Sequence, residues 1–282
     1  MFATLLGALP RPPLETDAAS EALLDATLAL QAEHGLEPVT DGGWPISDDI
    51  VESWRATADR AGRLVKAVMV GPWTSGRAVA EVRADIDALA DAGCAWIEVH
   101  EPAAVSLGAD DERVGFAEAH RALTLDVGPG VHLSLAITGG NADTAGIDTI
   151  LAGAYASLAL DLIDGPDNWR LAVAAPTEVG VICGTVSTRA GSDDGPEILL
   201  WAAGYAASSG GRGMDRVGLA TAGSLADLSW ETAAEKVRRL GEAARLAAAS
   251  PEERLASIDP RAVDIRSAAM GRTVPPRRRR PT

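Results

Sequence analysis

One short segment of the sequence carries residue types that could bind a metal ion or move a proton. His132-Leu133-Ser134 lies within the apolar run Val131–Ala136, which favours a β-strand. Residues i and i+2 of a strand point to the same face, so a His-x-Cys pair there would supply two zinc ligands. The second position is a serine, and the chain has only 2 cysteines, Cys94 and Cys183. The segment therefore predicts an imidazole and a hydroxyl on one strand face, without a thiolate.

These side chains need a framework, and the sequence alternates short β-rich runs with longer amphipathic segments. Apolar residues spaced three and four apart run through Arg77–Ala92, which is the period of a helix. We expect strands at Ala3–Leu6, Pro38–Thr40, Val65–Val70, Trp96–Val99, Val131–Ala136, Leu158–Leu162, Val179–Cys183 and Val217–Ala220. We expect helices at Thr16–His34, Asp48–Ala61, Arg77–Ala92, Asp110–Leu125, Thr144–Ser157, Pro196–Ser209 and Trp230–Ala249, and a weak one within Asp164–Thr177.

Eight strands that alternate with helices predict an α/β fold with a parallel sheet, and eight is the number that closes a barrel. We predict a single (β/α)8 TIM barrel over residues 1–249, with a short helical extension over 250–270 packed on the barrel. Residues 271–282 are expected to be a disordered basic tail, or else an arm that binds an acidic partner. The alternative is a doubly wound open sheet, which would usually show a glycine-rich phosphate loop after the first strand. Leu6-Gly7-Ala8-Leu9-Pro10 is not such a loop.

The composition limits the class of partner. The formal net charge of −15 argues against binding to nucleic acid or to an anionic membrane surface, because both would repel the chain. The apolar start of the chain lacks a basic leader, and no uncharged apolar stretch is long enough to span a membrane. We therefore expect a cytoplasmic protein with a small-molecule substrate. The sequence leaves the oligomeric state open.

In a barrel the active site forms at the carboxyl ends of the strands, and polar residues follow several of the expected strands here. A histidine with a carboxylate partner is a common general base, and tryptophan can stack on a flat ring. Alternatively, His132 is a core histidine bonded to a neighbouring strand, and the tryptophans pack helices onto the barrel. The expected acid–base groups are His132, Glu101, His100 and Asp161. The expected substrate-binding residues are Asp41, Trp44, Trp73, Thr74, Ser134, Ser187 and Arg189.

Five segments occur in an order that resembles a known family. The chain is similar over roughly residues 3 to 247 to the catalytic barrel of cobalamin-independent methionine synthase, one of the uroporphyrinogen decarboxylase-like barrels. The similarity is to the short single-barrel members of that family. The segments that carry it are Leu6–Pro10, Gly35–Gly43 (GLEPVTDGG), Lys66–Thr74 (KAVMVGPWT), Gly93–Ala103 (GCAWIEVHEPA) and Val131–Ser134 (VHLS).

The resemblance implies methyl transfer to a thiol that zinc holds as a thiolate. The family's zinc ligands are a His-x-Cys pair, a glutamate on the next strand and a cysteine after the last strand. His132 matches the histidine, Ser134 replaces the first cysteine, Asp161 falls near the glutamate, and Ala222 falls near the last cysteine. The resemblance thus leaves His132 and Asp161 as weak candidate zinc ligands in a degraded site, and a folate-type compound as a possible methyl donor.

The amino-acid pocket of the family is altered as well. Ala8 replaces a serine, and His100 replaces an aspartate that would hold an amino group. We therefore expect a divergent methyl or one-carbon transferase with an altered acceptor, and methionine synthesis itself is in doubt. The alternatives are a metal-free acid–base barrel enzyme, or a non-catalytic relative that binds a small molecule.

Overall fold

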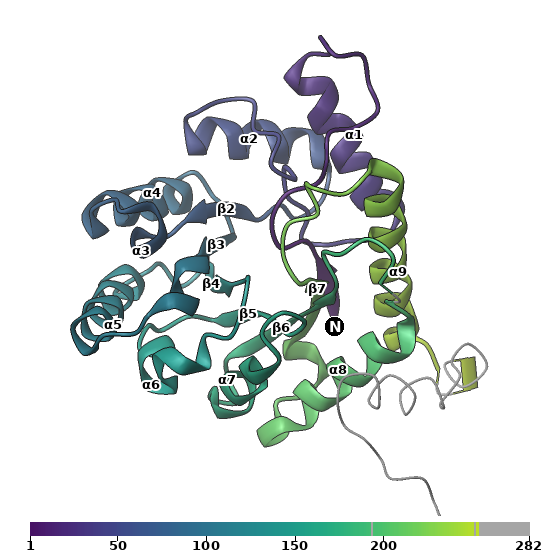
Figure 1. The fold of residues 1–282 in the computed structure, drawn as a ribbon. Helices are drawn as coiled ribbons and strands as arrows, with labels where there is room; N and C mark the ends of the chain where they lie inside the picture. The colour runs from purple at the N-terminus through teal and green to yellow at the C-terminus, as the bar shows by residue number, and fades with distance from the viewer. Residues whose placement is uncertain (193, 251, 254–282) are drawn as a thin grey trace, which may run out of the picture.

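Parallel strands form one curled sheet with helices on its outer face (Figure 1), and the computed structural model describes residues 1–192, 194–250 and 252–253. In the described residues the sheet has seven strands in the order β1-β7-β6-β5-β4-β3-β2, all parallel. The strands are β1 (Phe2–Thr4), β2 (Ala67–Val70), β3 (Trp96–His100), β4 (His132–Ile137), β5 (Ser157–Asp161), β6 (Gly180–Val186) and β7 (Val217–Thr221). The α-helices are α1 (Ser20–Glu33), α2 (Ile50–Ala61), α3 (Pro72–Ser75), α4 (Val79–Asp91), α5 (Asp110–Thr124), α6 (Ile147–Ile150), α7 (Trp169–Ala174), α8 (Pro196–Ser208) and α9 (Trp230–Ala248).

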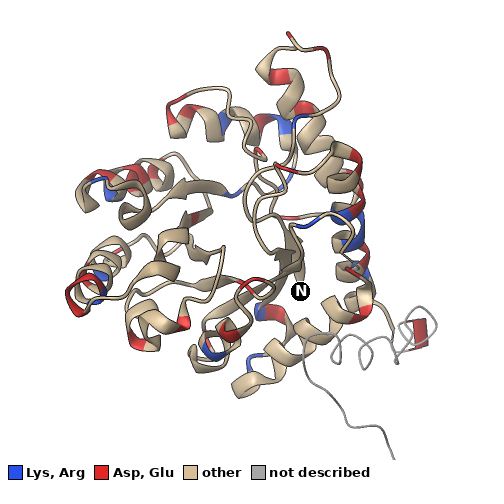
Figure 2. Ribbon diagram, in the orientation of Figure 1, with Lys and Arg blue, Asp and Glu red and all other residues tan. Residues whose placement is uncertain are grey.

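The strands β3 to β7 are buried on both faces almost throughout, which explains their nearly continuous apolar sequences, whereas Val70 of β2 is exposed. Outward side chains such as Leu133 and Leu135 belong to the large core between the sheet and the helices. Inward side chains form a second, smaller cluster that includes Trp96, Ala136 and Leu6. Most charged residues lie instead on the outer helices and loops (Figure 2). A charged residue that points into the sheet is therefore an exception that needs a partner.

The expected strand at Pro38–Thr40 is not a regular strand. Val39 makes one parallel bridge to Val65, and the amide of Glu37 donates to the carbonyl of Ala3 at 2.9 Å. The chain then turns away at Gly42 and Gly43, both with positive φ, so the pairing stops.

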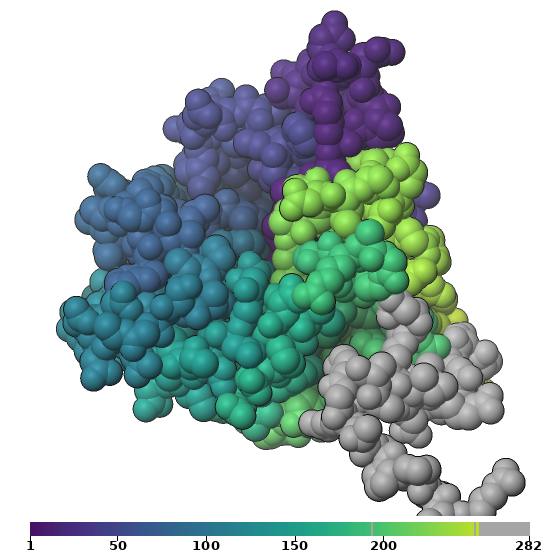
Figure 3. Space-filling model, viewed as in Figure 1, coloured from purple at the N-terminus to yellow at the C-terminus, as the bar shows by residue number. Residues whose placement is uncertain are grey.

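Residues 37–39 nevertheless link the two edges of the sheet. Successive helices lie side by side around the molecule, and α9 lies beside α1 (Figure 3). The fold is TIM-barrel-like, not a doubly wound sheet, but it lacks the regular eighth strand that the sequence predicted.

One expected helix is much shorter than predicted. The segment Thr144–Ser157 contains only α6, of 4 residues, because Gly146 begins it with a φ of 99° and Gly153 follows it. The expected extension lies almost wholly outside the described residues, and the expected tail over 271–282 lies outside them entirely. None of the described helices is long and apolar enough to cross a membrane.

Candidate functional site

A chain of three charged or ionisable side chains runs inside the sheet toward its carboxyl end. Glu98 Oε1 lies 2.7 Å from Lys66 Nζ and 2.8 Å from His100 Nε2. Lys66 also donates to the carbonyl of Leu5 at 2.8 Å. The side chains of Lys66 and Glu98 are fully buried, whereas that of His100 is 13% exposed. His100, the last residue of β3, therefore brings this network to the surface at the barrel mouth.

The electrostatics of the network keep Glu98 ionised. Burial alone would raise the pKa of Glu98, but the Lys66 ammonium and the His100 imidazole together hold it at about 2. Burial lowers the pKa of Lys66, and Glu98 opposes that shift. A carboxylate bonded to one ring nitrogen holds the imidazole in a fixed orientation. The other ring nitrogen of His100, Nδ1, forms no hydrogen bond with any described protein atom.

Ser134 supports this network below the mouth. Its hydroxyl accepts a hydrogen bond from Trp96 Nε1 at 3.1 Å and lies 3.4 Å from Glu98 Oε2. The side chain is fully buried. The sequence analysis expected Ser134 to bind a substrate. The structure instead buries its side chain inside the sheet, away from the mouth.

The position expected for His132 is wrong. His132 is the first residue of β4 and pairs in register with Trp96, so it lies at the amino end of the sheet, opposite the mouth. Its ring stacks on Trp96 at a centroid distance of 3.9 Å, and Nε2 lies 2.8 Å from Ser157 Oγ. Burial lowers its pKa. His132 is thus bonded to the neighbouring strand, as in the alternative that the sequence analysis held, although its side chain is only partly buried.

Glu101 directly follows β3, as expected, but its side chain makes structural contacts. Glu101 is fully buried, and its two carboxylate oxygens accept hydrogen bonds from the amides of Trp73 at 2.9 Å and Thr74 at 2.7 Å. These amides belong to the first turn of α3, which has no intrahelical partner for them. His120 Nε2 lies 3.3 Å from the same carboxylate, and Nδ1 of the same ring lies 2.5 Å from the hydroxyl oxygen of Tyr155. The contacts of Glu101 are therefore those of a helix cap.

Trp73 and Thr74, the expected substrate-binding residues beyond β2, make packing and turn contacts. Trp73 meets Phe116 of α5 edge to face, with ring centroids 6.2 Å apart. Thr74 Oγ1 accepts a hydrogen bond from the amide of Ala103 at 3.1 Å. The structure thus places Trp73 as a residue that packs a helix, while a contact with a bound ring stays a prediction.

Asp161 does lie at the carboxyl end of β5, as expected. It is almost fully buried, and its carboxylate accepts hydrogen bonds from the amides of Ile163, Asp164 and Gly139 at 2.9, 2.9 and 3.0 Å. Burial raises its pKa, and those amides oppose the shift. The carboxylate shapes the loops that leave β4 and β5.

Asp41 lines a cavity beside the mouth, between α2 and β2. The cavity measures about 850 Å³ and is also lined by Lys66, Val68 and Val70. Burial raises the pKa of Asp41, and the amide of Gly43 partly opposes this. Asp41 is thus placed where a ligand at the mouth could meet it.

Trp44 follows Asp41 in the same loop but is not among the residues that line this cavity. The guanidinium of Arg11 lies over its ring at 5.8 Å, and Nε1 is buried without a partner among the described residues.

Ser187 and Arg189 lie in the loop after β6. Ser187 is buried, its amide donates to Asp194 at 2.9 Å, and its hydroxyl accepts from the amide of Arg189. Arg189 is exposed and pairs with Asp164 of the neighbouring loop, which follows β5. Lys236 of α9 lies 2.5 Å from Asp194 and holds this loop in place. Of the two side chains, only that of Arg189 is exposed, and its contact with a substrate stays a prediction.

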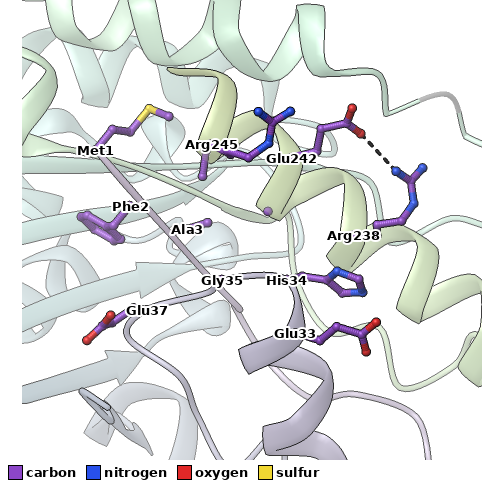
Figure 4. Close-up of a pocket in the computed structure, with 12 residues that line it drawn as sticks. Met1, Phe2, Ala3, Glu33, His34, Gly35, Glu37, Arg238, Glu242 and Arg245 are labelled. Atoms are coloured by element: carbon purple, nitrogen blue, oxygen red, sulfur yellow. Dashed lines mark hydrogen bonds and ion pairs between the residues drawn. The ribbon is translucent and has the colours of Figure 1, made fainter. Parts of the chain in front are cut away.

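A second cavity of about 800 Å³ lies at the opposite, amino end of the sheet, between β1, α1 and α9. Figure 4 shows Arg238 directed at Glu242 there, and the two side chains lie 3.1 Å apart. Arg238 also pairs with Glu235, and Arg245 pairs with Glu253. The cations beside this cavity are therefore already neutralised.

The sequence analysis missed the residues that make the mouth distinctive. Of the expected catalytic residues, His100 stands in the network, but its partners Lys66 and Glu98 were not singled out. A signal was present, because each is a charged residue inside an apolar strand and buried charges require a partner. Asp41, Asp161 and Arg189 reach the carboxyl end, whereas His132 and Ser134 do not.

The described residues do not fit the zinc site that the resemblance implies. His132 and Asp161 lie at opposite ends of the sheet, and β4 reaches its carboxyl end with Ala136 and Ile137. Within the described chain, no group of three or more His, Cys, Asp or Glu side chains is arranged to hold a metal ion. Cys94 and Cys183 are both buried elsewhere, and burial raises the pKa of each thiol.

Sequence comparisons agree with the resemblance. No family model matches the chain. Two strains of Rhodopseudomonas palustris have a 5-methyltetrahydropteroyltriglutamate–homocysteine methyltransferase that is 30% identical over 205 residues. The match covers 66% of this chain, and the chain spans only 25% of the length of those relatives.

Solved structures with a similar fold include enzymes of two kinds. A protein from Listeria monocytogenes, described as a candidate vitamin B12-independent methionine synthase, has a TM-score of 0.68 at 12% identity, covering 87% of this chain and 97% of its own. A methyltransferase from Methanosarcina mazei has a TM-score of 0.61 at 15% identity, over 88% and 94% of the two chains. A dihydrodipicolinate synthase from Aquifex aeolicus has a TM-score of 0.55 at 12% identity, over 98% and 84%. The chain is thus a TIM-barrel-like protein with weak sequence similarity to methionine synthase-type methyltransferases.

Proposed function

We propose that the chain is a methyl-transfer-type barrel enzyme in which His100 and Glu98, instead of a zinc-bound thiolate, activate the methyl acceptor. The observation that carries the proposal is the pairing of His100 Nε2 with Glu98 Oε1 at 2.8 Å, at the carboxyl end of β3. The similarity to methyltransferases supports the reaction class. The substrates themselves are part of the proposal, because the chain spans a quarter of those relatives.

The chemistry needs a base because a neutral acceptor is a poor nucleophile. His100 Nδ1 takes the proton of the acceptor's X–H group, and the freed electron pair of X forms the new bond to the methyl carbon. The bond between that carbon and the donor nitrogen breaks, and the nitrogen keeps the pair and is protonated from solvent. Glu98 orients the imidazole and stabilises the positive charge that His100 gains, while Lys66 keeps Glu98 ionised. General-base catalysis of this kind contributes roughly 10²- to 10⁴-fold.

A folate-type donor is the first donor to test, because the name of the relatives includes one. The acceptor differs from homocysteine in this proposal. His100 is an imidazole at the mouth where the resemblance places a carboxylate for an amino group, so an amino acid loses one of its partners. A thiol, amine or activated hydroxyl without a charged amino group fits this mouth better.

The test is transfer of an isotope-labelled methyl group from 5-methyltetrahydrofolate to a panel of thiols, amines and phenols, in buffer treated with a chelator. We expect transfer to at least one acceptor without added zinc. His100→Gln should lower the rate about 10²-fold or more, and Glu98→Gln should lower it by a comparable amount. Arg170→Gln, an exposed position on the outer surface, is the matched control and should keep the full rate.

Two results would contradict the proposal. Transfer that depends strictly on added zinc would restore a metal mechanism, and full activity of His100→Gln would show that His100 is not the base.

A second candidate function uses the same observation, since a histidine–glutamate pair serves proton transfer in general. A metal-free acid–base reaction without a methyl donor would give turnover that depends on His100 in the absence of any folate. Tight ligand binding with no turnover in either assay would favour a non-catalytic binding protein.

A further inference from the structure

An exposed aromatic cluster lies on the outer surface of α7 and α8. Trp201 and Tyr205 of α8 are 44% and 42% exposed, and no other Trp, Tyr or Phe side chain of the described residues is as exposed. Their rings are nearly parallel, with centroids 5.5 Å apart and an angle of 12° between the planes. Trp169 of α7 stands edge to face against both rings, at 6.0 and 4.9 Å. The three rings thus form one group that spans two helices.

The sequence of each helix explains why this group faces outward. The side of α8 that packs on the sheet consists of small and aliphatic residues, Leu199, Ala202, Ala203 and Ala206. Trp201 and Tyr205 are four residues apart, so they share the opposite side. Trp169 and Val173 of α7 have the same spacing, and Val173 is 48% exposed. A continuous apolar surface of this kind usually marks a contact with another segment or molecule.

The chain itself contains a segment whose chemistry matches the cluster. Val274–Pro281 (VPPRRRRP) lies outside the described residues. Proline-rich peptides dock on aromatic-lined surfaces, and the planar guanidinium of arginine stacks on the faces of Trp and Tyr rings. The formal net charge of the whole chain is −15 despite these four arginines, so the rest of the chain attracts them. Glu197, one turn before Trp201, adds a carboxylate on the same side of α8.

The end of the described chain lies within reach of the cluster. Helices α8 and α9 pack side by side (Figure 1), and each follows a strand of the parallel sheet, so both end at its amino end. Glu253 pairs with Arg245 of α9 at 3.0 Å, and Tyr205 lies in the last turn of α8. The connection from Glu253 to Val274 has about 20 residues, which span roughly 30 Å as a helix and at most about 70 Å when extended. Helix α8 itself is about 20 Å long.

We infer that Val274–Pro281 docks on the cluster of Trp169, Trp201 and Tyr205 of the same chain. The arginine guanidinium groups and the prolines pack on the exposed rings, and the acidic surface of the chain holds the positive charge. A tethered segment has a much higher effective concentration at the cluster than the same segment of a second copy, which favours docking within one chain. The contact lies on the outer surface and does not depend on methyl transfer.

The experiment places a nitroxide spin label on Thr282→Cys in the full chain and records the indole N–H signals of the 7 tryptophans by NMR. The natural cysteines, Cys94 and Cys183, are buried, so the label attaches to the new thiol. We expect the signals of Trp169 and Trp201 to lose most of their intensity, because a nitroxide broadens nearby signals. The signal of Trp54, which lies on α2, should keep its intensity.

Two variants separate docking from the proximity that the tether alone imposes. Replacement of Arg277–Arg280 by glutamine keeps the tether and should restore the Trp169 and Trp201 signals. Trp201→Ala/Tyr205→Ala removes the exposed rings and should restore the Trp169 signal. Both positions are exposed, so this variant should fold. Val114→Ala is the matched control, because Val114 is an exposed apolar residue of α5 and its loss should leave the broadening unchanged.

Three results would overturn the inference. Equal broadening in the glutamine variant would mean that the tether alone brings the label near α8. Broadening of signals from other surfaces, with Trp169 and Trp201 unaffected, would place the segment elsewhere. A mixture of spin-labelled unenriched chains with unlabelled ¹⁵N chains tests for a second copy, and equal broadening there would assign the contact to two chains. Each result leaves the proposed function untouched, because none of them involves the mouth.

Discussion

Trp96 and His132 stack at the amino end of the sheet, one on β3 and one on β4, with ring centroids 3.9 Å apart. The Phe2 ring also meets Trp96 edge to face, with the ring centroids 5.3 Å apart. Gly218 leaves room for this group, because a Cβ there would lie 2.5 Å from the Phe2 ring. The three rings close the amino end of the barrel, and His132 is part of that closure.

His132→Ala should therefore lower stability and leave chemistry at the mouth unchanged. Loss of the ring pair and of the bond to Ser157 should cost roughly 1–3 kcal/mol of unfolding free energy. Burial places the pKa of His132 below its ordinary 6.5, so protonation favours the unfolded chain. Its contribution is complete above that value and is lost as pH falls through it. Urea titrations at several pH values should show a flatter pH profile for the variant. Loss of activity at unchanged stability would return His132 to the active site.

Lys66→Met should destabilise the protein strongly, because it leaves Glu98 buried without a counter-charge. Removal of one member of a buried ion pair typically costs about 3–5 kcal/mol. The double variant Lys66→Met/Glu98→Gln should regain part of that loss, and equilibrium unfolding of the four proteins measures the coupling. Additive effects would show that the 2.7 Å contact contributes little.

The same pair predicts stability at acid pH. The pKa of Glu98 is held at about 2 in the folded protein, below its ordinary 4.5. Its stabilising effect is present above 4.5 and is lost as pH falls from there toward 2. Denaturation curves between neutral and acid pH should show less loss for Glu98→Gln than for the wild type. An identical acid profile for both proteins would contradict the low pKa.

Sequence patterns predicted the strands well because a buried parallel strand is a short apolar run between turns. Because the whole run is apolar, the sequence does not show at which end of the strand a residue lies. His132 and Ala136 belong to one continuous apolar run, yet they lie about 13 Å apart, at opposite ends of β4. Only the register with β3 shows which end faces the mouth, and register depends on contacts far apart in the sequence.

Glycine turns explain what else the patterns could not show. Pro38–Thr40 has the composition of a strand, but Gly42 and Gly43 take the chain away before a second bridge to the neighbouring strand forms. The position of Glu101 next to His100 likewise suggested a joint catalytic role. Its carboxylate is instead bound by two amides of α3, a contact that requires the folded loop.

Glu101→Gln should act on the loop before it acts on any reaction. An amide in place of the carboxylate would turn an N–H group toward the amides of Trp73 and Thr74, and should cost about 2–4 kcal/mol. Tryptophan fluorescence and thermal unfolding measure the change. Glu112→Gln is the control, because Glu112 accepts from two amides at the start of α5 but is much less buried than Glu101 and should matter far less. Equal effects of the two substitutions would show that burial of Glu101 is unimportant.

Arg212→Met should be among the most destabilising single substitutions. Arg212 is only 2% exposed and donates to four carbonyls, those of Val179, Ala206, Ala172 and Ala175, at 2.8–3.0 Å. Three of these lie at or just beyond the ends of α7 and α8, where carbonyls lack helical partners. We expect a loss of about 3 kcal/mol or more in chemical denaturation. Arg170→Met, at an exposed ion pair, should stay within about 1 kcal/mol, and a similar loss there would contradict the carbonyl-cage explanation.

Zinc titration of the chelator-treated protein distinguishes a zinc-dependent mechanism from the proposed His100–Glu98 mechanism. A tight site needs about four ligands that converge, and the two candidates lie at opposite ends of the sheet. Each is also engaged already, His132 with Ser157 and Asp161 with three main-chain amides. We expect zinc to bind no more tightly than micromolar, with the same affinity in Asp161→Asn and His132→Ala. Stoichiometric nanomolar binding that either substitution abolishes would mean that the ligands rearrange on binding, and thiolate chemistry would then replace the His100–Glu98 mechanism.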